Sequence, residues 1–88
     1  MKVIMLYRPN SEHERQIMTY QQDFSRISSA RTELVSIETK EGDNLVRVYG
    51  ITDYPAIVVI SDDGAVQNMW QGSNLPLMNE VAGYAFSS

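Results

Sequence analysis

The sequence predicts one α/β domain over residues 1–88, with a four-stranded mixed sheet that carries helices on both faces. Two uninterrupted apolar runs, Val3–Leu6 and Ala56–Ile60, are typical of strands that are covered on both faces and lie at the centre of a sheet. A long amphipathic stretch follows the first run, and a tight turn follows the second. The expected element order is therefore βαβ-α-ββα, with the strands in the order 2-1-3-4.

The first half of the chain contains two expected strands and a long helix. The strands are Lys2–Tyr7 and the more polar Thr32–Glu38, whose composition suits a sheet edge. The helix is expected from about Glu12 to Ala30, and because it connects the two strands they should be parallel with a right-handed crossover. Apolar residues spaced by three and four define its inner face: Ile17, Tyr20, Phe24 and Ile27.

A short second helix is expected after a loop at Lys40-Glu41-Gly42, with Asp43 as its cap. Its apolar residues are Leu45, Val46, Val48 and Tyr49. Gly50 should end it, because glycine adopts the left-handed conformation at a helix C-terminus without a side-chain penalty.

The last part of the chain is expected to be a hairpin followed by a helix. Asp62-Asp63-Gly64 has the composition of a tight turn, and Ala65–Trp70 alternates as a strand. The final helix is expected to start at Gly72-Ser73-Asn74, with Pro76 in its first turn, where the missing donor costs nothing. Its inner stripe is Leu77, Val81 and Tyr84, with Ala85 adjoining.

Composition excludes several classes of function. Seven Lys and Arg against eleven Asp and Glu give a formal net charge of −4, without the basic stripe that nucleic-acid binding requires. The apolar runs are too short for a signal-peptide core or a membrane span, so no membrane partner is expected and a cytoplasmic location is the default. The absence of cysteine excludes disulfides, thiol catalysis and thiolate metal sites.

The order of Gly50, a short loop, Pro55, a buried strand, a tight turn and Gly72 resembles the thioredoxin superfamily. Members of that superfamily carry a cis-proline at the position that Pro55 occupies. The resemblance extends from about Lys2 to Phe86 and is closest in length to the glutaredoxins. It implies a minimal, glutaredoxin-sized thioredoxin-like fold.

The stretch Tyr7–Arg15 is similar to the glutaredoxin segment that leads into the Cys-x-x-Cys motif, and the two cysteine positions fall on Ser11 and Glu14. In the family, the partial positive charge at a helix N-terminus lowers the pKa of the first thiol. A serine hydroxyl is far too basic to be ionised by that field, and Glu14 cannot resolve a mixed disulfide. Thiol–disulfide exchange by this chain is therefore excluded.

The residues at this helix start allow several interpretations. Ser11 and Glu14 have the spacing of a capping box, although the free amides there could instead bind an anion. His13 could act as a base for Ser11, but residues two apart diverge and no third residue is identifiable to orient the ring. Glu12, His13 and Glu14 are consecutive and cannot converge on a metal ion. No catalytic residue and no metal site are expected.

Tyr54-Pro55 is the best remaining candidate for a binding function. In the family, the residue before the cis-proline offers its backbone to an extended peptide, which requires no thiol. The alternative is that Pro55 only shapes the start of the strand and that Trp70 is half-buried packing. The predicted groove contains Asn10, Ser11, Glu12, His13, Asp53, Tyr54, Pro55, Trp70 and Gly72.

The leading hypothesis is a redox-inactive binding or adaptor module that takes a protein or extended peptide and is itself a monomer or weak dimer. A second hypothesis is enzymatic: glutathione or another small thiol binds beside Ser11 and supplies the sulfur. The carboxylates of glutathione would then need a clamp formed by Arg8, Arg15 and Arg47. A third is a scaffold that associates with itself through an edge strand.

Overall fold

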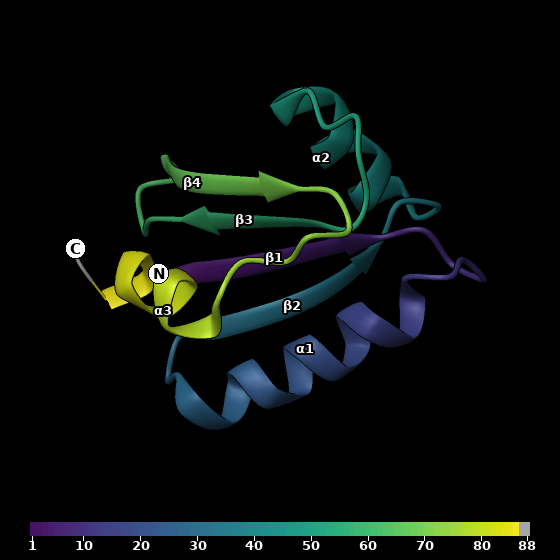
Figure 1. The fold of residues 1–88 in the computed structure, drawn as a ribbon. Coiled ribbons are helices and arrows are strands. Elements are labelled where there is room, and N and C mark those ends of the chain that lie inside the picture. Colours follow the sequence, from purple (N-terminus) through teal and green to yellow (C-terminus); the bar gives the residue numbers. More distant parts are fainter. Residues whose placement is uncertain (87–88) are drawn as a thin grey trace.

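A four-stranded sheet in the order β2-β1-β3-β4 organises the chain, as Figure 1 shows. The structure is a computed structural model that describes the backbone of residues 1–86 and the side chains of residues 1–84. The elements are β1 (Lys2–Tyr7), α1 (Glu14–Ile27), β2 (Arg31–Ser36), α2 (Lys40–Tyr49), β3 (Ala56–Ile60), β4 (Val66–Gln71) and α3 (Met78–Phe86). The predicted fold class and strand order are confirmed.

β1 is the strand on which both halves of the sheet are assembled. It pairs in parallel with β2, so that Met5 lies opposite Leu34, and antiparallel with β3, so that Met5 also lies opposite Ile57. β3 continues antiparallel into β4. The two uninterrupted apolar strands are therefore the two central ones, as the sequence predicts.

Apolar side chains form a core on each face of the sheet. On one face, β1 and β3 pack against α1 and α3: Val3, Met5, Ile17, Tyr20, Phe24, Ile57, Val59 and Val81. On the other face, they pack beneath α2: Ile4, Leu6, Val35, Ile51, Ala56, Val58 and Ile60. Successive strand residues alternate between these two cores, which explains why Val3–Leu6 of β1 and all of β3 are apolar.

α1 is shorter than predicted at both ends. It begins at Glu14, and its N-cap His13 makes no capping bond through its side chain. It ends at Ile27. The sequence analysis placed Ile27 on the inner face of the helix, but its side chain is 59% exposed. Ser28, in extended conformation, takes the buried position there, and its hydroxyl accepts the N–H of Ala30.

α2 begins four residues earlier than predicted, at Lys40. Its cap is Thr39, whose hydroxyl accepts the N–H of Gly42 at 3.0 Å, and not Asp43. The expected loop at Lys40-Glu41-Gly42 is therefore the first helical turn. Gly42 lies so close to β2 that an added Cβ would stand 1.9 Å from the carbonyl oxygen of Ser36.

The far end of α2 agrees better with the sequence analysis. Gly50 ends the helix in the left-handed conformation at φ 64°, as predicted. Leu45, Val46 and Tyr49 pack against the core, whereas Val48 is 64% exposed.

α3 begins later than predicted, at Met78 and not at Gly72-Ser73-Asn74. Pro76 therefore lies before the helix, where its carbonyl accepts the hydroxyl of Tyr20 at 2.8 Å. Leu77 is 72% exposed and does not belong to the inner stripe, whereas Val81 is fully buried. The side chain of Ala85, also predicted on that stripe, lies outside the described residues.

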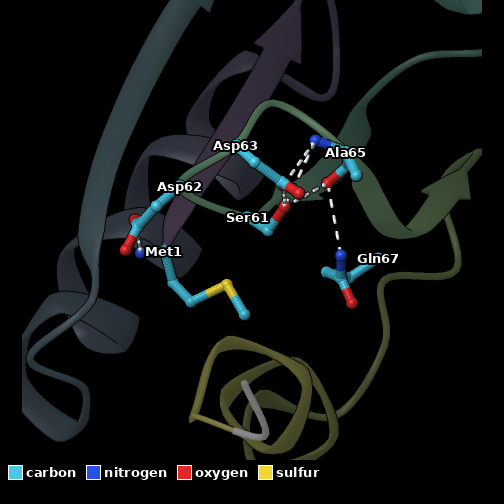
Figure 2. Close-up of polar contacts among 6 residues, drawn as sticks. All are labelled: Met1, Ser61, Asp62, Asp63, Ala65 and Gln67. Atoms are coloured by element: carbon cyan, nitrogen blue, oxygen red, sulfur yellow. Dashed lines mark hydrogen bonds and ion pairs between the residues drawn. The ribbon is translucent and has the colours of Figure 1, made fainter.

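The β3–β4 turn is held by a compact set of polar contacts, shown in Figure 2. The Asp63 carboxylate accepts from the Ser61 hydroxyl and from the N–H of Ala65, and these bonds lower the pKa of Asp63. Gly64 completes the turn at φ 90°. The N-terminal ammonium of Met1 pairs with Asp62 at 2.5 Å.

β4 is irregular along the sheet edge. Its register against β3 shifts between Val66 and Asn68, which leaves Gln67 as an extra residue in a bulge. The Asn68 side chain accepts the N–H of Met69 at 2.7 Å. None of its six residues is charged.

Within residues 1–86, none of the helices combines the length and the apolar character that crossing a membrane demands.

Gly42→Ala should destabilise the domain by about 1–3 kcal/mol, because the new methyl group overlaps the backbone of β2. Urea unfolding followed by circular dichroism measures the loss. Gly83→Ala is the matched control: Gly83 lies inside α3 with open space around it, so the same change should stabilise the domain by about 0.5–1 kcal/mol. Equal effects at the two positions would contradict the close approach of α2 to β2.

Candidate functional site

Three loops meet at the end of the sheet where β1 stops and β3 starts. The N–H of Gly72, after β4, donates to the carbonyl of Pro55 at 3.0 Å. The guanidinium carbon of Arg8, after β1, lies 5.5 Å from the centroid of the Tyr54 ring. The structure therefore brings together the β1–α1 loop, the segment before β3 and the residue that follows β4.

The β1–α1 loop folds back on itself. Asn10 is in the left-handed region at φ 58°, where Asn is enriched among residues other than glycine. Its N–H donates to the Glu14 carboxylate at 2.6 Å, and the Ser11 hydroxyl donates to the carbonyl of Arg8 at 2.5 Å. The predicted capping box does not form: Ser11 is not the N-cap, and Glu14 reaches the amide of Asn10 instead.

The same contacts bear on the other interpretations of this helix start. The Nε2 atom of His13 accepts the N–H of Arg8 at 3.2 Å. The Ser11 hydroxyl is directed at a carbonyl, and the structure does not pair it with His13. Glu12 is exposed. Among the described residues, no group of three or more His, Cys, Asp or Glu could hold a metal ion.

The segment before β3 is held by a residue that the sequence analysis missed. The Oε1 atom of Gln71 accepts the N–H groups of Thr52 at 2.9 Å and Asp53 at 3.1 Å, and the Thr52 hydroxyl lies 3.4 Å away. These residues are about twenty positions apart, and nothing in the local pattern marks Gln71. The proximity follows only from the pairing of Ala56 with Gln71 across β3 and β4.

Tyr54 lies where the three loops meet, and both its backbone and its ring are part of the candidate site. The peptide bond between Tyr54 and Pro55 is cis. Within residues 1–86, no hydrogen bond uses the N–H or C=O of Tyr54. The ring is half-buried against the core beneath α2 and lies under the guanidinium of Arg8.

Trp70 lies elsewhere. Its ring packs on the core that faces α1 and α3, edge-on to Tyr84 with centroids 5.6 Å apart. Tyr54 packs against the opposite face of the sheet, so the structure does not bring these two aromatic residues together. All of the predicted groove residues except Trp70 lie on the three converging loops: Asn10, Ser11, Glu12, His13, Asp53, Tyr54, Pro55 and Gly72.

A separate depression lies between α1 and the β4–α3 loop. Its volume is about 510 Å³, and its lining is Gln16, Thr19, Tyr20, Asp23, Ser73, Asn74, Leu75, Pro76 and Met78. The Gln16 amide donates to the carbonyl of Ser73 at 3.3 Å. Burial, with a smaller contribution from the negative charge of Glu80, raises the pKa of Tyr20 to about 12.

A smaller depression of about 340 Å³ is lined by Ser11, Glu14, Arg15 and Met18. Ser11 and Glu14 in this lining are the two positions that the sequence analysis matched to the family cysteines, and the Glu14 carboxylate is already bonded to the N–H of Asn10.

No family model matches this chain, and no curated protein sequence is similar to it. Solved structures are similar. Thioredoxin 1 from the thermophilic eubacterium Thermosipho africanus TCF52B superimposes with a TM-score of 0.70 at 10% identity, over 96% of this chain and 89% of that one. A malarial protein gives a TM-score of 0.68 at 11% identity, over 94% and 90%.

The chain has a thioredoxin-like fold. The predicted resemblance is thus confirmed at the level of the fold, with the Cys-x-x-Cys motif absent because the sequence contains no cysteine.

Gln71→Met should remove the acceptor of the Thr52 and Asp53 N–H groups and so free the segment before β3 from β4. Loss of these exposed bonds is expected to cost about 1 kcal/mol, seen as roughly fivefold faster hydrogen exchange of the two amides by NMR. Gln71→Glu keeps the acceptor and should restore slow exchange. Gln67→Met is the control, because Gln67 lies on the same strand and makes no bond to this segment. Equally fast exchange of the Thr52 and Asp53 amides in Gln67→Met would contradict the role assigned to Gln71.

Tyr20→Phe should change how stability depends on alkaline pH. The phenol has an ordinary pKa of 10.0 and a folded-state value of about 12, so its contribution is intact below pH 10 and is lost as the pH rises toward 12. The variant also lacks the bond to Pro76 and should be about 1 kcal/mol less stable at pH 7. Urea unfolding at pH 7 and pH 11 should show this difference shrinking. Tyr7→Phe serves as the control, and a constant difference for Tyr20→Phe would contradict the prediction.

Proposed function

We propose that this domain is a redox-inactive binding module that takes an extended segment of another protein along Tyr54. The observation that carries the proposal is the unpaired N–H and C=O of Tyr54, placed where three loops converge. An extended peptide can add to such a backbone as a short strand, with main-chain hydrogen bonds for affinity and neighbouring side chains for specificity.

The surroundings of Tyr54 support a prepared binding surface. Gln71 holds the two residues before it, and Gly72 holds the carbonyl of the residue after it. A backbone fixed on both sides loses little conformational freedom when a partner binds, which improves affinity. The cation–π contact between the Arg8 guanidinium and the Tyr54 ring contributes about 0.5–1 kcal/mol toward holding these two side chains in place.

The side chains at the site favour binding over catalysis. Ser11 and His13 are each bonded to the backbone of Arg8 and not to each other, so the serine lacks an activating base. Glutathione binding is less well supported than peptide binding. The Glu14 carboxylate occupies the amide of Asn10 and places a negative charge where a glutathione carboxylate would need a positive one.

A randomised library of capped heptapeptides, selected against the domain, should yield peptides whose binding perturbs the NMR amide signals of Arg8, Asn10, Tyr54 and Gly72. Tyr54→Ala should weaken these peptides by about tenfold, because a half-buried aromatic ring that contacts the partner contributes about 1–2 kcal/mol. Val48→Ala, on the exposed face of α2, is the control and should leave affinity unchanged.

Backbone pairing is tested separately from side-chain contact. Two versions of a selected peptide, N-methylated at odd or at even positions, should differ in affinity, because only one set of amides faces Tyr54. Equal binding of the two versions, or perturbation confined to β2 and α2, would remove the basis of the proposal. Perturbation of Ser11 and Arg15 by millimolar glutathione would instead favour the small-thiol hypothesis.

A further inference from the structure

We propose that Asp63 is the aspartate of this chain that isomerises spontaneously to isoaspartate, and that Ser61 slows the reaction in the folded domain. The inference is independent of the proposed function. Asp63 lies in the β3–β4 turn that Figure 2 shows, whereas Tyr54 precedes β3 at the other end of that strand. The modification acts on the hairpin and not on the candidate site.

Isoaspartate forms through a cyclic imide. The amide nitrogen of the following residue gives up its proton and attacks the Cγ atom of the aspartic acid side chain, and a Cγ–O bond breaks as water leaves. Water then adds to one of the two imide carbonyls and reopens the ring. Opening at Cγ restores aspartate, whereas opening at the main-chain carbonyl leaves a backbone that runs through Cγ. The net reaction neither gains nor loses an atom.

The neighbour of Asp63 in the sequence favours this reaction. Glycine carries no side chain that could obstruct attack by its nitrogen, and Asp63 is the only Asp or Asn in the sequence that precedes a glycine. Asp63 and Gly64 are both exposed, so water can reach the imide from solvent. The sequence therefore marks Asp63 as the reactive position, and the folded turn sets the rate.

The turn keeps both reacting groups out of the reaction. The N–H of Gly64 donates to the carbonyl of Ser61 at 2.9 Å, which holds the attacking nitrogen in place with its proton. The Asp63 carboxylate accepts from the Ser61 hydroxyl and from the N–H of Ala65. These bonds, that from Ser61 most of all, lower the pKa of Asp63 and keep it ionised. An ionised carboxylate resists attack because an oxygen leaves readily only as water.

Ser61 is the residue through which the turn closes. Its N–H donates to the carbonyl of Ala65 at 2.8 Å, and its own carbonyl accepts the N–H of Gly64. Its hydroxyl donates to Asp63 and accepts the N–H of Ala65 at 3.2 Å. Loss of the hydroxyl alone frees the Asp63 carboxylate while both backbone bonds of Ser61 can remain.

The product adds one carbon atom to the backbone of the turn. That atom lies between Ser61 and Ala65, which the present turn joins by a backbone hydrogen bond. Isoaspartate at Asp63 therefore weakens the hairpin. It also makes the aged chain a substrate for a methyltransferase that recognises isoaspartyl carboxylates.

The test is incubation of the whole chain in ¹⁸O-labelled water at physiological pH and temperature, followed by peptide mapping with electron-transfer fragmentation. Each passage through the imide introduces one solvent oxygen, whichever product forms. Label should enter Asp63 about tenfold or more faster in urea than in the folded domain, because the protecting bonds are absent there. Ser61→Ala should raise the folded-state rate about three- to fivefold, as for the loss of one hydrogen bond, and should not change the rate in urea.

Three variants serve as controls. Ser61→Thr keeps a hydroxyl and should label as slowly as the unchanged domain. Ser25→Ala removes an exposed hydroxyl on α1 that donates to the carbonyl of Gln22, and it should have no effect. Gly42→Ala destabilises the domain at α2 without touching the turn, so the rate at Asp63 should stay the same.

Three kinds of result would overturn the proposal. Faster labelling of another aspartate than of Asp63 in the unfolded chain would overturn the choice of site. Equal rates in the folded and unfolded chains would overturn protection by the turn. An unchanged rate in Ser61→Ala, or an equal acceleration in Gly42→Ala, would overturn the role of Ser61.

Discussion

The burial of two neighbouring strands on both faces is the constraint on which the rest of this structure depends. β1 and β3 carry apolar residues at every position of their centres, so each face of the sheet needs a helical cover. α1 and α3 supply one cover and α2 supplies the other. Because β1 and β3 are antiparallel, β1 stops and β3 starts at the same end of the sheet. The loops that form the candidate site meet at that end.

The sequence specifies this framework well because the framework depends on local patterns. Strand order follows from continuous apolarity, the end of α2 follows from Gly50, and the hairpin follows from its turn residues. Helix starts were predicted less well. The cap is Thr39 and not Asp43, and the turn that Thr39 caps carries Gly42 against β2, a contact between distant residues that no local pattern contains.

The candidate site shows the same division. Tyr54 and Pro55 could be identified because a proline before a buried strand is a local signal. Gln71 and the lining of the depression could not, because their roles depend on contacts between residues far apart in the chain. Loops 72–77 and 8–13 are positioned by the helices and strands that they contact. The residue types of Ser11 and His13 therefore did not predict that both side chains bond to the backbone of Arg8.

β4 has a further consequence for how copies of this domain behave in concentrated solution. Many proteins keep exposed sheet edges from sticking together by electrostatic repulsion, which fades as salt is added. β4 has no charged residue, and the features that make its edge irregular are the bulge at Gln67 and the Asn68 amide oxygen that accepts the N–H of Met69. Resistance to edge-to-edge aggregation that comes from shape persists at high ionic strength and across the pH range in which the fold itself survives.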